Sequence, residues 1–183
     1  MIRFYEGDFR YSLTSVVSSE NIEPGKKLTM KILLAVDHSV YSEAALRALI
    51  AQVRPENTEV AVLHVMELAL ADFESRETFQ HTRPAHIKEA QQLVEKFVSE
   101  LKACGYSATP VVEEGVAKEA ILNFAEHWKP DVIFLGSHGR RAFRRLSLGG
   151  VTEAVARHAN CSVEIVRAPR LGARRAETGQ IPP

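Results

Sequence analysis

The sequence predicts an α/β fold: a doubly wound, mostly parallel sheet of five strands between two layers of helices. Two observations predict it. Continuous apolar runs have the length expected of strands buried on both faces, and the clearest are MKILLAV (30–36), EVAVLHVM (59–66) and DVIFL (131–135). Amphipathic helical patterns alternate with these runs. Strict alternation of strands and helices is typical of parallel strands joined by helical crossovers.

Each element has a recognisable pattern or boundary. After the first strand, Ser39 can cap a helix with an apolar stripe that ends at Val53. Gly105 and Pro130 are stop signals for two further helices. The remaining elements are therefore expected as a helix over about 84–104, a strand over 107–113, a helix over 117–128, a helix over 149–159 and a strand over 162–166.

The length of 183 residues allows one domain with extensions. Residues 1–29 and 169–183 are polar and show no sustained periodicity, so we expect a flexible N-terminal extension, a folded domain over 30–168 and a disordered C-terminal tail. The longest connection, over 67–83, contains the sequence HTRP and is predicted to be a surface loop or lid.

Charge and cysteine content exclude several classes of protein. Lys and Arg total 23, as do Asp and Glu, so no global basic field favours nucleic acid. The two cysteines, Cys104 and Cys161, form no disulfide framework and favour a reducing compartment. No apolar run reaches the roughly 18 residues that span a bilayer. We therefore expect a cytoplasmic protein without a membrane or nucleic-acid partner.

Polar and glycine residues follow the first and fourth strands, at Asp37 and at Gly136-Ser-His-Gly139. Ligands of open parallel sheets bind beyond the carboxyl ends of strands, where the strand order reverses. Gly136 and Gly139 permit close approach of the backbone to a ligand. The next helix starts with Gly149-Gly-Val-Thr152, whose free amides suit a phosphate. Asp37 has an alternative role as a helix cap.

The loop before that helix carries four arginines, Arg140, Arg141, Arg144 and Arg145. They would favour an anion, although solvated arginines in a plain loop are the alternative interpretation. The chain has neither the G-x4-G-K-[ST] sequence of a P-loop nor G-x-G-x-x-G after the first strand. His138 has no evident nucleophile or carboxylate partner, and Ser137 lacks the G-x-S-x-G frame. We therefore expect no catalytic residue and no metal site.

Four segments together resemble the universal stress protein family: KILLAVDHS, VLHVME, PDVIFLGSHGR and LGGVTEAVARHANCSVEIVR. The resemblance covers about residues 30–167. It implies a five-stranded sheet of the adenine nucleotide α-hydrolase-like group and ATP as ligand, with or without Mg²⁺. It also implies a homodimer that forms by edge pairing of the last strand, Ser162 to Val166.

The resemblance assigns a role to each candidate site residue, since ATP-binding members have the pattern G-x2-G-x9-G-[ST]. It implies an adenosine site formed by Ala35, Asp37 and Val65, a ribose side formed by Leu135 and Gly136, and a phosphate site formed by Gly139, Gly149, Gly150, Val151 and Thr152. Gly150 departs from the pattern, because a Ser or Thr is usual there. A lost hydrogen bond to a charged group costs about 1.5–3 kcal/mol, or roughly ten- to a hundredfold in affinity. The Thr152 hydroxyl could replace it in part.

These observations predict a stress-response protein that binds ATP and changes its contacts with a regulatory partner protein accordingly. Hydrolysis should be slow or absent, because no base to activate water is evident. The alternative is a nucleotide-independent interaction module on the same fold. An adenylating enzyme would need a further substrate domain, for which the chain has no room.

Overall fold

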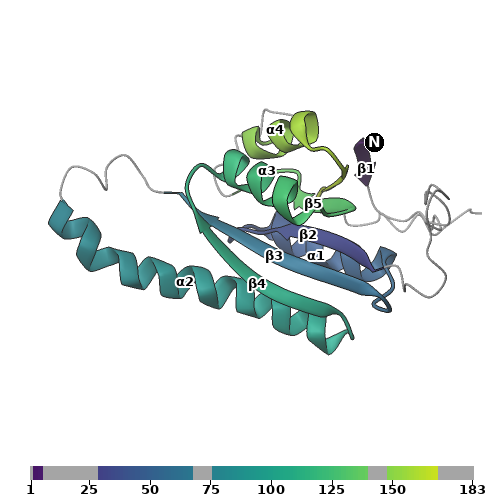
Figure 1. The fold of residues 1–183 in the computed structure, drawn as a ribbon, viewed down its shortest axis with the longest axis horizontal. Helices are drawn as coiled ribbons and strands as arrows, with labels where there is room; N and C mark the ends of the chain where they lie inside the picture. Colours follow the sequence, from purple (N-terminus) through teal and green to yellow (C-terminus); the bar gives the residue numbers. More distant parts are fainter. Residues whose placement is uncertain (1, 6–28, 68–75, 140–147, 169–183) are drawn as a thin grey trace, which may run out of the picture.

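The computed structural model of the chain describes residues 2–5, 29–67, 76–139 and 148–168 (Figure 1). The four arginines of the 140–147 loop and the predicted C-terminal tail therefore lie outside the described residues. The elements, in chain order, are β1 (Ile2–Tyr5), β2 (Met30–Ala35), α1 (Val40–Gln52), β3 (Thr58–Met66), α2 (Arg76–Ala103), β4 (Ser107–Glu114), α3 (Ala117–Trp128), β5 (Val132–Gly136), α4 (Gly150–His158) and β6 (Ser162–Val166).

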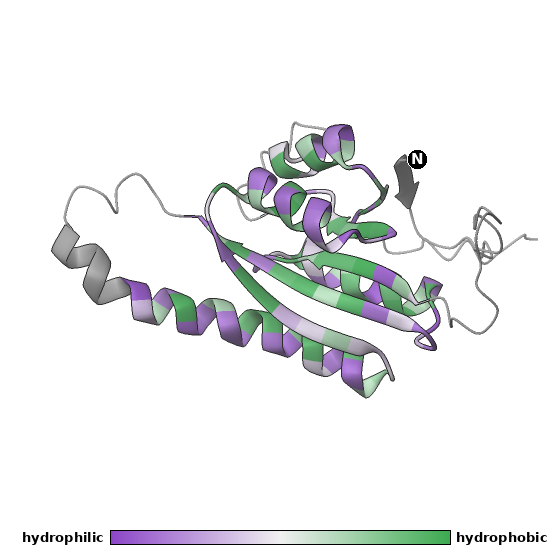
Figure 2. Cartoon of the chain, viewed as in Figure 1, coloured by the Kyte–Doolittle hydropathy of each residue, from purple (hydrophilic) through white to green (hydrophobic). Residues whose placement is uncertain are grey.

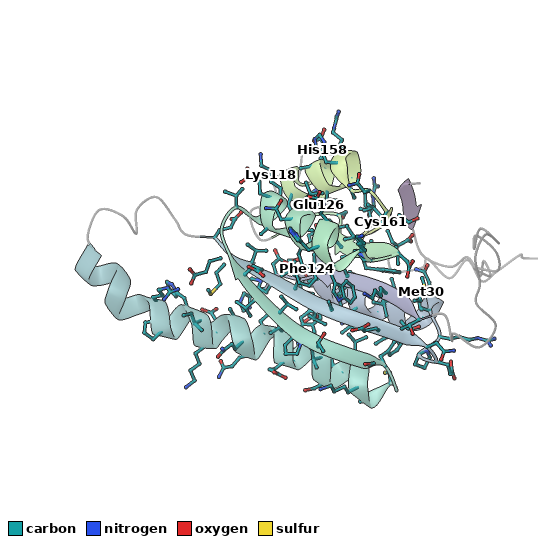
Figure 3. All side chains as sticks on the ribbon, viewed as in Figure 1. Met30, Lys118, Phe124, Glu126, His158 and Cys161 are labelled. Atoms are coloured by element: carbon teal, nitrogen blue, oxygen red, sulfur yellow. The ribbon has the colours of Figure 1, made fainter. Side chains whose placement is uncertain are left out.

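The strands form one parallel sheet in the order β1-β6-β5-β2-β3-β4. Met30 at the start of β2 and Cys161 just before β6 accordingly lie at the same end of the sheet (Figure 3). The chain builds outward from β2 through β3 to β4 and then returns to the other side of β2 with β5. The strand order thus reverses between β2 and β5. The predicted doubly wound fold is confirmed, and its switch point lies where the sequence predicted.

The sheet has a hydrophobic core on each face, because alternate strand residues point to opposite sides. On one face, Ile32 and Leu34 pack with residues of α1 and α2. On the other, Leu33 and Ala35 pack with residues of α3 and α4. The strands are accordingly apolar through the middle of the molecule, and the helices are polar outside (Figure 2). Lys118 and His158 point away from the sheet in Figure 3.

β1 was not predicted. We expected no strand before Met30, yet Ile2–Tyr5 pair in parallel with Val163 to Val166. Four residues are too few to show a period-two pattern, and their partner strand lies at the far end of the sequence. Tertiary pairing therefore forms this strand, and local sequence alone does not reveal it. The rest of the expected flexible extension, residues 6–28, lies outside the described residues.

α2 begins earlier than predicted. Residues 76–83, which we interpreted as part of a surface loop, are helical, and Pro84 lies inside the helix. Proline removes one helical hydrogen bond and therefore usually interrupts a helix. Packing of Phe97, Val98 and Leu101 in the core offsets that cost. Arg83 also ties this part of α2 to the end of β4, because its Nη2 lies 2.8 Å from Glu114 Oε1.

Candidate functional site

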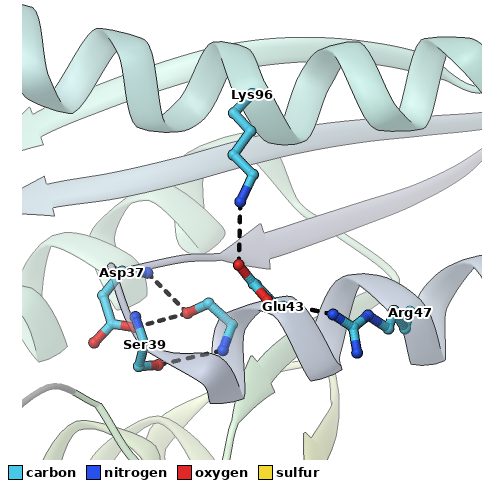
Figure 4. A network of polar contacts seen from close by, with 6 residues as sticks. Asp37, Ser39, Glu43, Arg47 and Lys96 are labelled. Carbon is cyan, nitrogen blue, oxygen red and sulfur yellow. Dashed lines mark hydrogen bonds and ion pairs between the residues drawn. The ribbon is translucent and has the colours of Figure 1, made fainter.

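The start of α1 closes one side of the switch point with its own side chains (Figure 4). Asp37 Oδ1 accepts hydrogen bonds from the Ser39 amide at 3.1 Å and from the Ser42 hydroxyl at 2.7 Å. The Asp37 amide donates to Ser42 Oγ at 2.9 Å, and Ser39 Oγ accepts from the Ser42 amide at 3.3 Å. Ser39 is the N-cap, as predicted. Asp37 therefore supports the cap by holding Ser39 and Ser42, while the side chain that caps the helix is that of Ser39.

Gly136, at the end of β5, has a packing role that the resemblance did not imply. A Cβ at this position would lie 2.5 Å from Tyr41 Cβ, which is closer than real Cβ atoms come. The glycine thus lets α1 pack directly against the end of β5. The carbonyl of Gly136 accepts a hydrogen bond from the Thr152 hydroxyl at 2.8 Å, which links the same point to α4. Gly136 is the position where the three elements meet.

The segment after β5 is held by backbone hydrogen bonds. The Ser137 amide donates to Val166 O at 2.7 Å, and the Gly149 amide donates to Ser137 O at 2.9 Å. A Cβ on Gly149 would lie 3.3 Å from His138 Cα. The His138 ring lies 5.2 Å from the Tyr41 ring, and its Nδ1 lies 3.1 Å from Ser137 Oγ. The two glycine segments on either side of the arginine loop are therefore brought into direct contact.

α4 starts without a side-chain cap. Gly149 is its N-cap residue and makes no side-chain hydrogen bond. The first i→i−4 bond of the helix joins the Glu153 amide to Gly149 O at 2.9 Å. The amides of Gly150, Val151 and Thr152 therefore precede the helical ladder, at the positive end of the helix dipole. A Cβ on Gly150 would meet nothing within 4 Å. A helix start of this kind can receive an anion.

The Thr152 hydroxyl has a different role from the one we expected. Its side chain is only 3% exposed. Its single proton is donated to Gly136 O. The hydroxyl thus holds the end of β5 against α4, and it is not a spare donor that replaces the hydroxyl missing at Gly150. The backbone amide of Thr152 keeps the position that the sequence predicted.

Gly139 and Asp37, predicted to be parts of one site, do come together. A Cβ on Gly139 would lie 2.8 Å from Asp37 Oδ2. Oδ1 of the same carboxylate caps α1, so the two oxygens face different elements. The structure thus places one edge of Asp37 beside the loop that follows β5.

The apolar site residues lie on the same face of the sheet as α4. Ala35 and Leu135 are register partners in neighbouring strands, and both are buried. Val65 and Val151 are partly buried and pack against the same core cluster. The structure therefore gathers the predicted adenosine and phosphate residues at one corner of the molecule. Leu135, at 3% exposed, belongs to the floor of that corner.

A hollow of about 270 Å³ lies on the opposite face, between α1 and α2. Three carboxylates line it, from Asp37, Glu43 and Glu89. Glu43 pairs with Lys96 at 3.1 Å, and Glu89 lies 3.4 Å from His38 Nε2. This acidic lining would repel phosphates. The candidate phosphate site is therefore the start of α4 and not this hollow.

The described ranges contain no group of three His, Cys, Asp or Glu residues that could hold a metal ion. Among the same residues, no helix is both long and apolar enough to cross a membrane. Burial, reinforced by the charge of Asp131, raises the pKa of the half-buried Cys161 thiol. A thiol with a raised pKa is a poor nucleophile.

Sequence reasoning missed Tyr41 and Ser42. Ser42 had a signal, because the pattern D-x-S-x-x-S places two hydroxyls within reach of one carboxylate at a helix start. Tyr41 had none, since its contacts with Gly136 and His138 depend on how α1 packs on β5.

The universal stress protein family matches residues 29–167 of the chain. The chain belongs to this family. Among curated relatives, universal stress protein MJ0577 of Methanocaldococcus jannaschii is 30% identical over 152 residues, which cover 75% of this chain and 94% of the relative. MJ0531 of the same organism is 26% identical over 161 residues, covering 87% and 92% of the two chains.

Solved structures agree with the fold described above. The structure of MJ0577 aligns with a TM-score of 0.70 at 30% identity and covers 78% of this chain and 99% of its own. An Arabidopsis thaliana universal stress protein with AMP bound aligns with a TM-score of 0.57 at 21% identity, covering 77% and 93%. At that identity the second comparison shows the shared fold alone.

Proposed function

We propose that this universal stress protein binds an adenine nucleotide, ATP foremost, at the switch point between β2 and β5. The observation that carries the proposal is the start of α4. There the amides of Gly150, Val151 and Thr152 precede the helical ladder, and Gly149 makes no side-chain cap. Helix N-termini of this kind bind phosphate through backbone N–H groups and the helix dipole.

Relatives of known structure support the choice of ligand. The Arabidopsis protein holds AMP, and two further universal stress protein structures hold cAMP and dAMP. The shared part of these ligands is an adenine nucleoside with phosphate. We extend this ligand class to the present chain because it shares their fold and because its glycine segments and apolar corner lie beyond the carboxyl ends of β2 and β5, where open parallel sheets bind ligands.

Each predicted residue has a role in the proposal. Ala35, Val65 and Leu135 form the apolar floor on which adenosine lies, and Asp37 offers a carboxylate edge to the ribose. Gly136 lets α1 approach, which fixes the wall of the site. Gly139 and Gly149 let the two backbone segments that would hold the phosphates lie close to Asp37 and His138, because a Cβ at either position would crowd those residues.

In this proposal the phosphates of ATP are held by the backbone amides at the start of α4. Mg²⁺ would be held by the phosphates, since the described residues offer no metal site of their own. His138 packs against Tyr41, and its Nδ1 faces the buried Ser137 hydroxyl. We therefore propose that hydrolysis is slow or absent, and that nucleotide occupancy regulates contacts with a partner protein in the cytoplasm.

The homodimer through Ser162 to Val166 also remains a proposal. The edge of β6 that it would use is paired with β1 in the described chain. A dimer at that edge therefore requires that β1 first leave it.

One observation favours a second candidate function. Gly150 lacks a hydroxyl, and the Thr152 hydroxyl is already donated to Gly136 O. The site therefore relies on amides at a position where the family pattern that the sequence resembles has Ser or Thr. If these amides are insufficient, the protein is a nucleotide-independent interaction module on the same fold.

Calorimetric and thermal titrations with adenosine, AMP, ADP and ATP, each with and without Mg²⁺, distinguish the two functions. We expect affinity to rise with each added phosphate and to be lost for adenosine. At a ligand concentration about 100 times Kd, the free energy of unfolding should rise by about 2.7 kcal/mol. An unchanged melting temperature with millimolar ATP would favour the interaction module.

A further inference from the structure

The pairing of β2 with β3 ends at the switch point. The last register pair of the two strands is Ala35 with Leu63. One further bond follows, from the Val36 amide to Leu63 O at 2.8 Å. The next bond of a parallel ladder would join the Val65 amide to Val36 O. Within the described residues that bond is not formed, so the ladder stops one step before Val65.

The imidazole of His64 takes the place of the missing bond. His64 Nδ1 lies 2.8 Å from Val36 O, and both residues are buried. A carbonyl oxygen only accepts hydrogen bonds, so Nδ1 carries the proton and donates it. A buried carbonyl without a donor is costly. The His64 side chain therefore satisfies a backbone group that the ladder leaves without a partner.

The same hydrogen bond fixes the peptide between Val36 and Asp37. A peptide is planar, so its carbonyl and its amide turn together. His64 holds the carbonyl, and the Asp37 amide donates to Ser42 Oγ at 2.9 Å on the other side of the peptide. Asp37 Oδ2 in turn lies 2.8 Å from the position of a Cβ on Gly139. One imidazole on β3 thus contributes to the orientation of Asp37 in the candidate site.

The side chains of His64 and Val65 lie on opposite faces of the sheet. Val60 and Val62 pack in the core cluster that contains residues of α1 and α2, and His64 follows them at the period of two. The ring of His38 lies against His64 on that face, with 5.9 Å between the ring centroids. Val65 packs with the cluster that contains residues of α3 and α4. The imidazole is therefore on the far side of the sheet from the candidate nucleotide site and can act on it only through the backbone.

The backbone groups of Val65 point toward β2. In a parallel strand the amide and carbonyl of one residue point to the same side, and successive residues alternate. Leu63 O accepts its hydrogen bond from the β2 side, and Met66 O accepts the Gly115 amide on the β4 side. The Val65 amide and carbonyl therefore face the side of β2, just beyond the last bond of the ladder. This is the end of the sheet where the proposed adenosine floor lies.

We propose that His64 is a positioning residue for the base of the bound nucleotide. Its imidazole takes the Val36 carbonyl, ends the β2–β3 ladder and leaves the backbone groups of Val65 to the base. The proposal rests on the proposed nucleotide site, because only a bound nucleotide would use those groups. Without the imidazole, the Val65 amide would pair with Val36 O, and the ladder would extend by one bond into the site.

The first experiment compares His64→Leu with His64→Asn in the full chain. Leucine removes the donor, whereas the asparagine amide places an N–H near the position of Nδ1. We expect His64→Leu to weaken ATP binding by about tenfold or more and to leave the affinity for inorganic triphosphate within about twofold, because the α4 amides are unchanged. His64→Asn should restore most of the ATP affinity. A leucine variant that binds ATP like the wild type, or that loses ATP and triphosphate equally, would overturn the proposal.

Thr58→Val is the matched control for loss of a buried hydrogen bond. Thr58 lies at the other end of β3, is buried like His64, and donates its hydroxyl proton to Arg54 O at 2.7 Å. The substitution should lower the free energy of unfolding and leave ATP affinity within about twofold. If Thr58→Val weakened ATP binding as much as His64→Leu does, the effect of His64 would be one of stability alone and the proposal would fail.

The second experiment measures amide hydrogen exchange in the ligand-free protein, so it separates this inference from the proposed function. In the wild type, the Val65 amide should exchange at least about tenfold faster than the Leu63 amide within the ladder, and His64→Leu should slow exchange at Val65 by about tenfold. A Val65 amide as protected as Leu63 in the wild type would contradict the role of His64, even if His64→Leu does not fold. The expected exchange rates in a protein that binds no ATP would instead refute the nucleotide site and leave the effect of His64 on the ladder established.

Discussion

The starts of α1 and α4 lie at the same edge of the sheet, after neighbouring strands, yet they are built in opposite ways. At α1, Ser39 Oγ accepts a hydrogen bond from the Ser42 amide, and Asp37 Oδ1 accepts from the Ser39 amide and the Ser42 hydroxyl. At α4, Gly149 makes no side-chain cap, and a Cβ on Gly150 would face open space. Both helices direct the positive end of their dipole toward this edge.

The difference shows how one fold separates stability from binding. The Ser39 side chain stabilises α1 and occupies the Ser42 amide, and the Asp37 carboxylate lies beside it, so an anion gains little there. At α4, glycines provide no side-chain cap, so the helix lacks that stabilisation and its first amides can bind a ligand. Asp37 adds to the contrast, because its negative charge lies at the start of α1. A phosphate would be repelled at α1 and attracted at α4.

Gly149→Val should have the largest effect on binding. The new side chain would crowd the His138 backbone, which is 3.3 Å from the position of its Cβ, and would block the approach of phosphate. We expect ATP affinity, measured by calorimetry, to fall about a hundredfold or more, which corresponds to roughly 2.7 kcal/mol. A circular dichroism spectrum like that of the wild type provides the control for folding. Retained affinity in a folded variant would contradict the site.

Thr152→Val tests whether that hydroxyl is structural. The substitution removes the donor to Gly136 O at nearly constant volume. An unsatisfied buried carbonyl costs about 1–3 kcal/mol, so the free energy of unfolding measured in urea should fall by that amount. Nucleotide affinity, measured at a temperature where the variant is folded, should change by less than about threefold. A large loss of affinity with unchanged stability would mean that the hydroxyl binds ligand.

Gly150→Ser sharpens the comparison by adding the hydroxyl that α4 lacks. The position has open space for a Cβ. A new hydrogen bond to a phosphate should raise ATP affinity by about tenfold, and the free energy of unfolding should change little. Gly150→Ala is the matched control, since it adds a Cβ without a hydroxyl. If both variants bind equally, the phosphate does not lie at this position.

Ser39→Ala tests the closed helix start and should have the smallest effect on binding. Loss of an N-cap hydroxyl costs about 1 kcal/mol of stability. Chemical denaturation should show that loss, while the Kd for ATP stays within about twofold. A much weaker Kd would mean that α1 also contacts the ligand, and the contrast between the two helix starts would then fail.

The sequence predicted those parts of the fold that depend on local pattern. Apolar runs identified β2, β3 and β5, and Ser39 marked the start of α1. The prediction was wrong where contacts between residues distant in the sequence determine the secondary structure. Ile2–Tyr5 become a strand only against β6, and Pro84 stays helical because the following turns are packed in the core. Neither effect has a signature in the neighbouring residues.

The residues of the candidate site also fall into a group that the sequence predicted and a group that it did not. Glycine spacing and a helix start predicted Gly139, Gly149 and the α4 amides, because backbone geometry is local. The second role of Asp37 and the packing role of Gly136 depend on Ser42 and Tyr41 of α1. Those contacts form only once α1 packs against β5. Roles of side chains that bridge two elements were therefore the least predictable part.

The central claim is that backbone amides at the start of α4, and not those of α1, receive the phosphates. Titration of ¹⁵N-labelled protein with ATP, followed by amide chemical shifts, tests it most directly, with adenosine as the control ligand. We predict that the amides of Gly150, Val151 and Thr152 shift with ATP and not with adenosine, while the Ser42 amide stays in place. Unchanged α4 amides at saturating ATP, or phosphate-dependent shifts confined to α1, would contradict the account.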